Sequence, residues 1–217
     1  MFSYTLPLTV TVLSYAITAL LCVDALRRAR LGANLFEHSI WAFSTAFVYL
    51  GMRMTVTLDS GLSLHYMGAA FLALLVGFPR ALLSMSAVFA IEAMRTGHWE
   101  TWGLRVLLAG AVPIWAMWLI VSLARRYLPR NPFVFLIGCG LFGQFAAYLV
   151  GLYASAIALI WFLPHTPRAF WDDFIPYATL LATGEAWLEG MLTTLLVVYV
   201  PGAVRLFDEG FYLSRRS

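Results

Sequence analysis

Long apolar runs, separated by short polar segments, make up almost the whole chain. The hydrocarbon core of a bilayer is about 30 Å thick and is crossed by about 20 helical residues, so runs of this kind predict transmembrane helices. We expect an all-α, polytopic membrane helix bundle of about seven transmembrane helices that forms a single domain over residues 1–217. The predicted spans are residues 4–26, 38–58, 64–77, 81–95, 104–123, 133–162 and 176–200.

The third run is too short to cross a bilayer unaided. It would give a helix of about 21 Å at about 1.5 Å per residue. It starts beside His65 and ends at a Gly77-Phe78-Pro79-Arg80 turn. A short helix is tolerated where its end faces protein or a water-filled cavity. His65 is therefore either an interfacial residue at the end of a tilted helix or a residue that lines such a cavity.

The arginines predict the orientation of the bundle. Cytoplasmic loops of membrane proteins carry an excess of basic residues. With the N-terminus outside and the C-terminus in the cytoplasm, ten of the 14 basic residues fall on the cytoplasmic side and four outside. The first run is followed by Arg27, Arg28 and Arg30, whereas a signal peptide carries its positive charge before the apolar core. We therefore expect a retained first helix.

Composition excludes several functions. Hydrophobic residues make up 62% of the chain and charged residues 12%, so a soluble domain is excluded, and the net charge of +3 reflects topology rather than nucleic-acid binding. All basic residues are arginine, and a Walker A loop needs a lysine to reach the phosphates of ATP. Work driven by ATP must therefore come from a partner chain. GCGLFG (138–143) lies in an apolar run without a preceding strand, and no HExxH or nucleophile motif is present, so the sequence does not favour an enzyme.

Two features of the later spans remain open at this stage. Gly143, Ala147, Gly151 and Ser155 form a small-residue ridge that would pack against another helix of the chain or against a partner. Glu185 and Glu189 share one helix face at i and i+4, and carboxylates within a span need a partner or water. Arg53, a polar cavity or a bound cation could each meet this need, or the carboxylates could handle substrate directly.

Four segments carry a resemblance to a known family. SLHYMGAAFLALLVGFPRALL (63–83) and TGHWETWGLRVLL (96–108) resemble the CbiM/NikM family. RRYLPRNPFVF (125–135) and GEAWLEGMLTTLLVVYVPGAVRLFDEGFYL (184–213) resemble its proteobacterial branch, and the similarity covers about residues 60–212. The resemblance implies the substrate-binding membrane component of an energy-coupling-factor (ECF) transporter in the bacterial inner membrane. Such a component imports cobalt or nickel, for cobalamin or nickel enzymes, beside a transmembrane coupling subunit and ATPase subunits. The metal would be transported cargo rather than a permanently bound cofactor.

The same resemblance implies a metal site and shows a departure from it. Family members bind the metal through the N-terminal amine, a histidine at the second position and a downstream histidine. Met1 would supply the amine and His65 matches the downstream histidine, but the second residue is Phe2. Co²⁺ and Ni²⁺ favour nitrogen donors, and square-planar nickel requires four. His98, Glu185, Glu189 or water would have to complete the site.

Two alternatives to metal import follow from Phe2 and the small-residue ridge. The chain could be a non-transporting membrane subunit that anchors or assembles a larger complex. It could also keep the transport frame and bind a small organic cargo instead of a metal.

Overall fold

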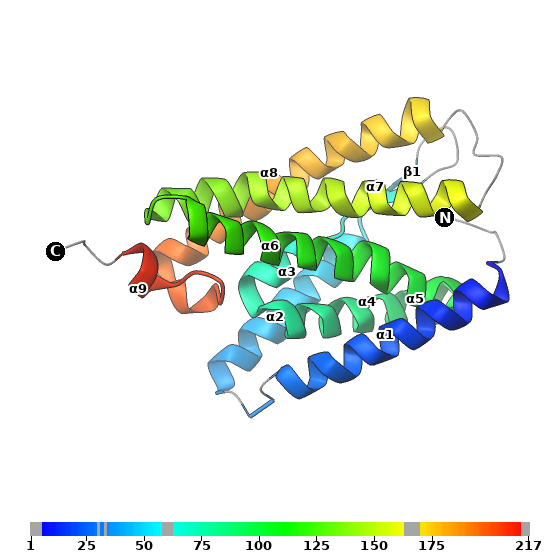
Figure 1. Cartoon of the computed structure of the whole chain (residues 1–217), viewed down its shortest axis with the longest axis horizontal. Coiled ribbons are helices and arrows are strands. Elements are labelled where there is room, and N and C mark those ends of the chain that lie inside the picture. Colours follow the sequence, from blue (N-terminus) through cyan, green and yellow to red (C-terminus); the bar gives the residue numbers. More distant parts are fainter. Residues whose placement is uncertain (1–5, 30, 33, 58–62, 163–169, 214–217) are drawn as a thin grey trace.

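The computed structural model describes residues 6–29, 31–32, 34–57, 63–162 and 170–213, which form an elongated bundle of helices with one small hairpin (Figure 1). The hairpin consists of β1 and β2, and three π-helical stretches, η2 to η4, precede or interrupt the longer helices. The helices and strands are α1 (Leu8–Arg28), α2 (Leu35–Met52), β1 (Thr55–Thr57), β2 (Ser63–His65), α3 (Ala69–Val76), α4 (Phe78–Thr96), η1 (Trp99–Thr101), α5 (Trp102–Arg105), η2 (Val106–Ala111), α6 (Val112–Tyr127), η3 (Val134–Gly143), α7 (Gln144–Phe162), η4 (Phe170–Phe174), α8 (Ile175–Tyr199), η5 (Pro201–Ala203) and α9 (Glu209–Tyr212).

Helices are present in all seven predicted runs. By length and composition, four helical stretches of the described residues qualify as membrane spans: Leu8–Arg28, Trp99–Tyr127, Val134–Ala158 and Ile175–Tyr199. Large apolar side chains on their outer faces are exposed, for example Leu20, Trp118, Phe142 and Leu180, as expected for contact with lipid. The count of seven spans and the orientation of the two termini stay predictions.

α3 lies at the centre of the bundle and is enclosed by protein. All eight of its residues are buried, and it packs against α2, α4 and α6. A glycine with positive φ stands at each end, Gly68 at +60° and Gly77 at +78°. The predicted break at residues 77–80 is therefore confirmed, because Gly77 ends α3 and Pro79 occupies the first turn of α4.

The predicted start of this short helix is wrong. His65 ends strand β2, and α3 begins four residues later at Ala69. The second predicted span is also too long, because α2 ends at Met52 and the chain continues as β1. The two strands are antiparallel, with Thr55 opposite His65 and Thr57 opposite Ser63. β-Branched residues favour this extended backbone over a helix.

Two of the π-helical stretches precede prolines. η2 comes just before Pro113 and η4 just before Pro176. A proline has no N–H, so the carbonyl four residues earlier loses its helical donor. A wider turn before the proline shifts the hydrogen-bond register and lets the helix continue.

The small-residue ridge packs within the chain. A Cβ on Gly143 would lie 3.1 Å from Ile120 Cγ2 and 3.2 Å from Met117 Cε, and one on Gly151 would lie 3.3 Å from Pro113 Cγ. All three neighbours belong to α6. The ridge therefore brings α7 and the end of η3 close to α6.

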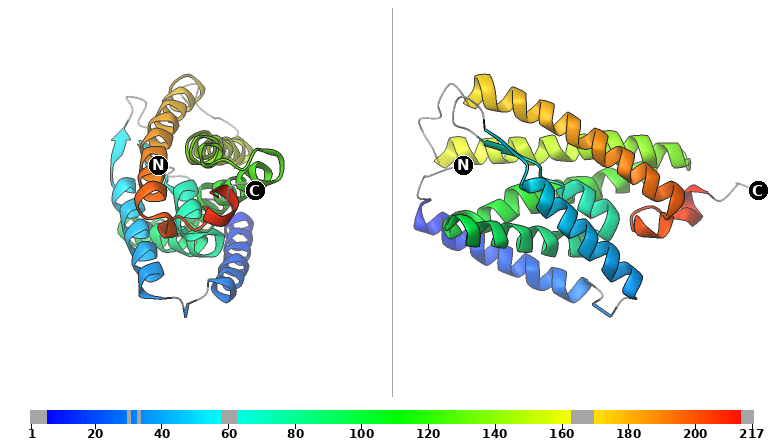
Figure 2. Two further views of the ribbon diagram at one scale, coloured as in Figure 1. Left: turned by 90° about the vertical axis from the view of Figure 1, so that its left-hand side faces the viewer. Right: turned by 180° about the vertical axis from the view of Figure 1, so that it is seen from behind.

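Residues 201–213, here called the C-terminal segment, close the end of α3. The N–H groups of Arg205 and Leu206 donate to the carbonyls of Leu75 and Leu74 at 3.0 and 3.1 Å. The last carbonyls of a helix have no partner within it, and buried ones need a donor from elsewhere. Figure 2 shows this segment folded back at the end of the bundle opposite the hairpin.

Candidate functional site

His65 lies at the boundary between the hairpin and the enclosed helix. It is partly buried at the end of β2, and residues 66–68 connect it to α3. Burial, reinforced by the positive charge of Arg105, lowers the pKa of its imidazole to about 4. The ring is therefore neutral at physiological pH, which is the form that binds a metal ion.

The residue after His65 is fixed from two sides. Tyr66 is buried, and its hydroxyl donates to Oε1 of Glu189 on α8 at 2.6 Å. Its ring meets Phe47 of α2 edge to face, with centroids 6.1 Å apart, and a side chain at Gly51 would overlap it. The peptide next to His65 is thus held between α2 and α8.

The second carboxylate binds the next residue of the chain. The N–H of Met67 donates to Oε2 of Glu185 at 3.2 Å. Glu185 and Glu189 are both buried, and one oxygen of each, Oε1 and Oε2 respectively, has no hydrogen-bond partner among the described residues. The hydroxyl of Tyr148, on α7, lies near Glu185, so the two carboxylates lie between residues 66–67 and α7.

The predicted site residues are not all brought together. Arg53 is exposed at the end of α2, and the hydrogen bonds to the two carboxylates come from Tyr66 and Met67 instead. His98 is exposed on the loop after α4, with Nδ1 3.4 Å from Oε1 of Glu100. Met1 and Phe2 lie outside the described residues. Within the described ranges, no three His, Cys, Asp or Glu side chains are grouped so that they could hold a metal ion.

Sequence reasoning missed the polar neighbours of the carboxylates. Tyr66 and Glu189 are 123 positions apart, so no local pattern links them. Gln144 is the one feature of the sequence that could have indicated a buried polar cluster, because it is a polar residue within an apolar run. It is buried one turn from Tyr148, and its amide nitrogen contacts Oγ1 of Thr193 at 3.4 Å.

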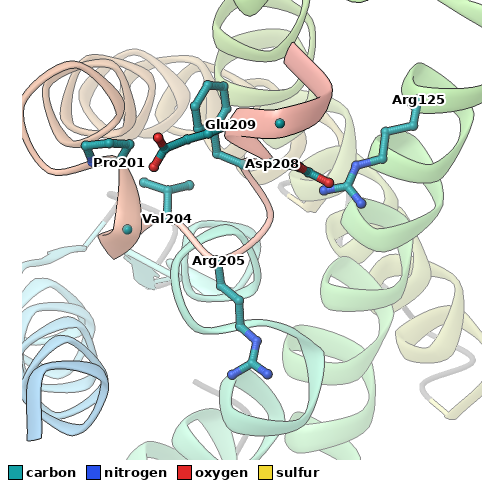
Figure 3. Close-up of a pocket in the computed structure, with 9 residues that line it drawn as sticks. Arg125, Pro201, Val204, Arg205, Asp208 and Glu209 are labelled. Atoms are coloured by element: carbon teal, nitrogen blue, oxygen red, sulfur yellow. The ribbon is translucent and has the colours of Figure 1, made fainter. Parts of the chain in front are cut away.

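A separate pocket lies at the other end of the bundle (Figure 3). Its volume is about 480 Å³, and it is lined by Arg125 of α6 and by residues of the C-terminal segment. Nη2 of Arg125 donates to the carbonyl of Leu206, and Figure 3 shows the Arg125 side chain directed toward Asp208. Basic and acidic side chains both line this pocket, which gives it no preference for one charge.

Comparison with known proteins adds a family and a fold. Residues 3–204 match the family described as "Cobalt uptake substrate-specific transmembrane region". Two solved structures are similar, described as a transition metal transporter and a truncated transition metal transporter. Each has a TM-score of 0.71 and 18% sequence identity; the first covers 93% of this chain and 92% of its own, the second 92% and 96%. No curated protein sequence matches this chain.

Proposed function

The chain belongs to the CbiM family of cobalt uptake transmembrane proteins, and from this premise we propose that it is the substrate-binding component of an ECF transporter that imports cobalt or nickel. The family match and the apolar helices show that the chain is a multi-pass membrane protein of metal uptake. The coupling to ECF partners and the choice between Co²⁺ and Ni²⁺ belong to the proposal.

The observation that carries the proposal is the placement of His65. His65 places a neutral imidazole beside an enclosed short helix, on a backbone anchored at the two following residues. Imidazole nitrogen is a preferred ligand of Co²⁺ and Ni²⁺. A ligand with a fixed backbone loses little conformational freedom when it binds a metal.

We propose that His65 and the N-terminal amine of Met1 are the protein donors to the transported ion. With Phe2 at the second position, the chain lacks one imidazole of the family set. Water or a further side chain would fill the remaining positions. We therefore expect weaker selectivity between Co²⁺ and Ni²⁺ than a four-nitrogen site would give.

Calorimetry of the purified protein tests this proposal. Titration with Co²⁺ and with Ni²⁺ should give binding heats for the wild type, and His65→Ala should weaken binding by more than about 100-fold, since loss of an outer-shell partner alone costs about 10–100-fold. His38→Ala is the matched control, because His38 bonds the carbonyl of Leu31 far from the hairpin. Equal heats for the wild type and His65→Ala would remove His65 from the site.

Co-purification separates transport from the alternative of an assembly subunit. The chain has no lysine for a Walker A loop, so a transporter of this kind depends on a partner ATPase. Recovery together with a coupling subunit and ATPases supports the proposal, whereas recovery with an unrelated enzyme complex favours an anchoring role. Binding of an organic molecule that persists in the presence of a chelator would indicate a different cargo.

A further inference from the structure

The two buried carboxylates of α8 are in contact with the segment that carries His65, although they lie about 120 positions away in sequence. We propose that Glu185 and Glu189 are positioning residues, which hold His65 in place through Tyr66 and Met67 and do not bind the metal themselves. This inference rests on the proposed function, because it assigns a role in the same metal site.

The geometry of the contact supports positioning. Glu185 and Glu189 are one helical turn apart on a single face of α8, and they bind two consecutive residues of the chain. One bond uses a side-chain hydroxyl and the other a backbone N–H. Together they fix both the direction of the chain and the side-chain rotamer immediately after His65.

The opposite side of the segment is also closed. The Tyr66 ring packs on Phe47 and on the bare backbone of Gly51. Gly68 has a φ of +60°, and a Cβ there would lie 2.6 Å from Val48 Cγ2. Residues 66–68 therefore fill a slot between α2 and α8, and they cannot shift toward α2 to relieve a lost bond on α8.

Carboxylates suit this role because leaving them unpaired is costly. The oxygens of a buried carboxyl group need hydrogen-bond partners. A buried acceptor that loses its donor bears the full desolvation penalty. The segment can leave α8 only by exposing two such acceptors, so the contact biases the backbone at His65 toward one arrangement.

The grouping of donors does not favour direct ligation. Tyr66 and Met67 occupy Oε1 of Glu189 and Oε2 of Glu185, which leaves a single oxygen on each carboxylate. Within the described ranges these carboxylates are not part of a three-residue cluster that could hold a metal. Co²⁺ and Ni²⁺ moreover favour nitrogen over carboxylate oxygen.

Tyr66→Phe tests the inference by removing only the hydroxyl that reaches Glu189. Co²⁺ affinity should fall about 10-fold, in the range found for outer-shell partners of metal ligands. The visible absorption of bound Co²⁺ should change as well, because the imidazole is held less firmly. Tyr212→Phe is the matched control, since it removes a hydroxyl from another buried tyrosine at the opposite end of the bundle, and it should leave affinity and spectrum unchanged.

Variants of Glu189 distinguish positioning from ligation. Glu189→Ala should weaken Co²⁺ binding as much as Tyr66→Phe, and the double variant should lose no more than either alone. Glu189→Gln keeps an oxygen that accepts the Tyr66 hydroxyl, so it should restore affinity and spectrum. Failure of Glu189→Gln to rescue, or wild-type affinity and spectrum in both Tyr66→Phe and Glu189→Ala, would overturn the inference.

Hydrogen–deuterium exchange of the metal-free protein keeps this result separate from the fate of the proposed function. Peptides covering residues 63–68 should exchange faster in Tyr66→Phe and Glu189→Ala than in the wild type and Tyr212→Phe. If the wild type binds neither Co²⁺ nor Ni²⁺, the proposed function fails, and the exchange rates still decide whether α8 holds the segment. Unchanged exchange in both variants would show that it does not.

Discussion

At the scale of the residue, Gly68 is the position where backbone and packing demands coincide. Its φ of +60° is a conformation that L side chains rarely adopt, and Val48 and Tyr66 occupy the space where a Cβ would go. The conformation turns the chain from the extended His65 strand into α3 within a few residues. The site and the enclosed helix therefore both depend on the absence of a side chain here.

Gly68→Ala should accordingly destabilise the protein in two ways. The left-handed backbone costs an L-residue about 1–2 kcal/mol, and overpacking against Val48 costs about 1–3 kcal/mol more. Gly97→Ala is the matched control, because Gly97 has a φ of +76° with nothing within 4 Å of its Cβ position. Thermal unfolding in detergent should show a larger loss for Gly68→Ala; equal losses would mean that the slot around residue 68 accommodates a methyl group.

Sequence patterns were informative where the signal was local. The Gly77–Pro79 break and the shared face of Glu185 and Glu189 both rest on neighbours within one or two turns, whereas the role of His65 as a ligand stays a prediction. The partners of the carboxylates could not be found in this way, because Tyr66 and Met67 reach them through tertiary contacts across more than 100 positions. Arg53 was a reasonable candidate on charge alone, but it lies exposed at the end of α2.

At the scale of the element, α3 is completed by a distant part of the chain. Its last carbonyls, at Leu74 and Leu75, receive N–H groups from Leu206 and Arg205. Eight residues form too few internal hydrogen bonds for a stable isolated helix. Enclosure by α2, α4 and α6, together with this external cap, maintains the helix instead.

Leu206→Pro should loosen α3 by removing one of these two donors. The buried carbonyl of Leu74 would then be unsatisfied, at a cost of about 1–3 kcal/mol. Leu213→Pro is the comparison, because it removes the donor to Glu209 at the exposed end of α9 and not a contact with α3. Hydrogen–deuterium exchange in peptides spanning residues 69–76 should accelerate only in Leu206→Pro; protection equal to the wild type would show that the cap is dispensable.

The predicted bounds of the second and third helices differ from those in the structure. The apolar pattern continues past Met52 and begins again at Leu64, so it predicts helix on both sides of the turn. The structure forms a hairpin there, because Thr55, Val56 and Thr57 pair with Ser63, Leu64 and His65. The π-helical turns before Pro113 and Pro176 could not be predicted from the sequence either, because they change the hydrogen-bond register without changing the hydrophobic pattern.

At the scale of the whole molecule, the hairpin with His65 and the C-terminal segment lie at opposite ends of the bundle (Figures 1 and 2). Ten of the 14 arginines fall on the side predicted to face the cytoplasm. With that orientation, the candidate metal site lies toward the outside and the pocket around Arg125 faces the cytoplasm. The all-helical membrane class and the family could be predicted from sequence, because both depend on composition and on contiguous segments.

Cysteine labelling should establish this orientation. In a background of Cys22→Ala and Cys139→Ala, a membrane-impermeant maleimide should label Thr96→Cys in intact spheroplasts. It should label Asn131→Cys, in the arginine-rich loop between α6 and α7, only in inverted vesicles. Both positions are exposed, so access rather than burial decides the result. The reverse pattern would mean that the arginine bias does not set the topology of this chain.

The enclosure of α3 has a consequence for biogenesis. A helix of eight residues cannot partition into lipid as an independent unit, and it has no lipid-facing side in the finished protein. The helices that enclose α3 are synthesised both before and after it. Its last carbonyls find their donors only in residues 205 and 206, which are 130 and 132 positions after their acceptors. The packing of α3 into the bundle should therefore be the last step of assembly. Before this step the bundle is a partly open intermediate, to which membrane chaperones and quality-control proteases would have access.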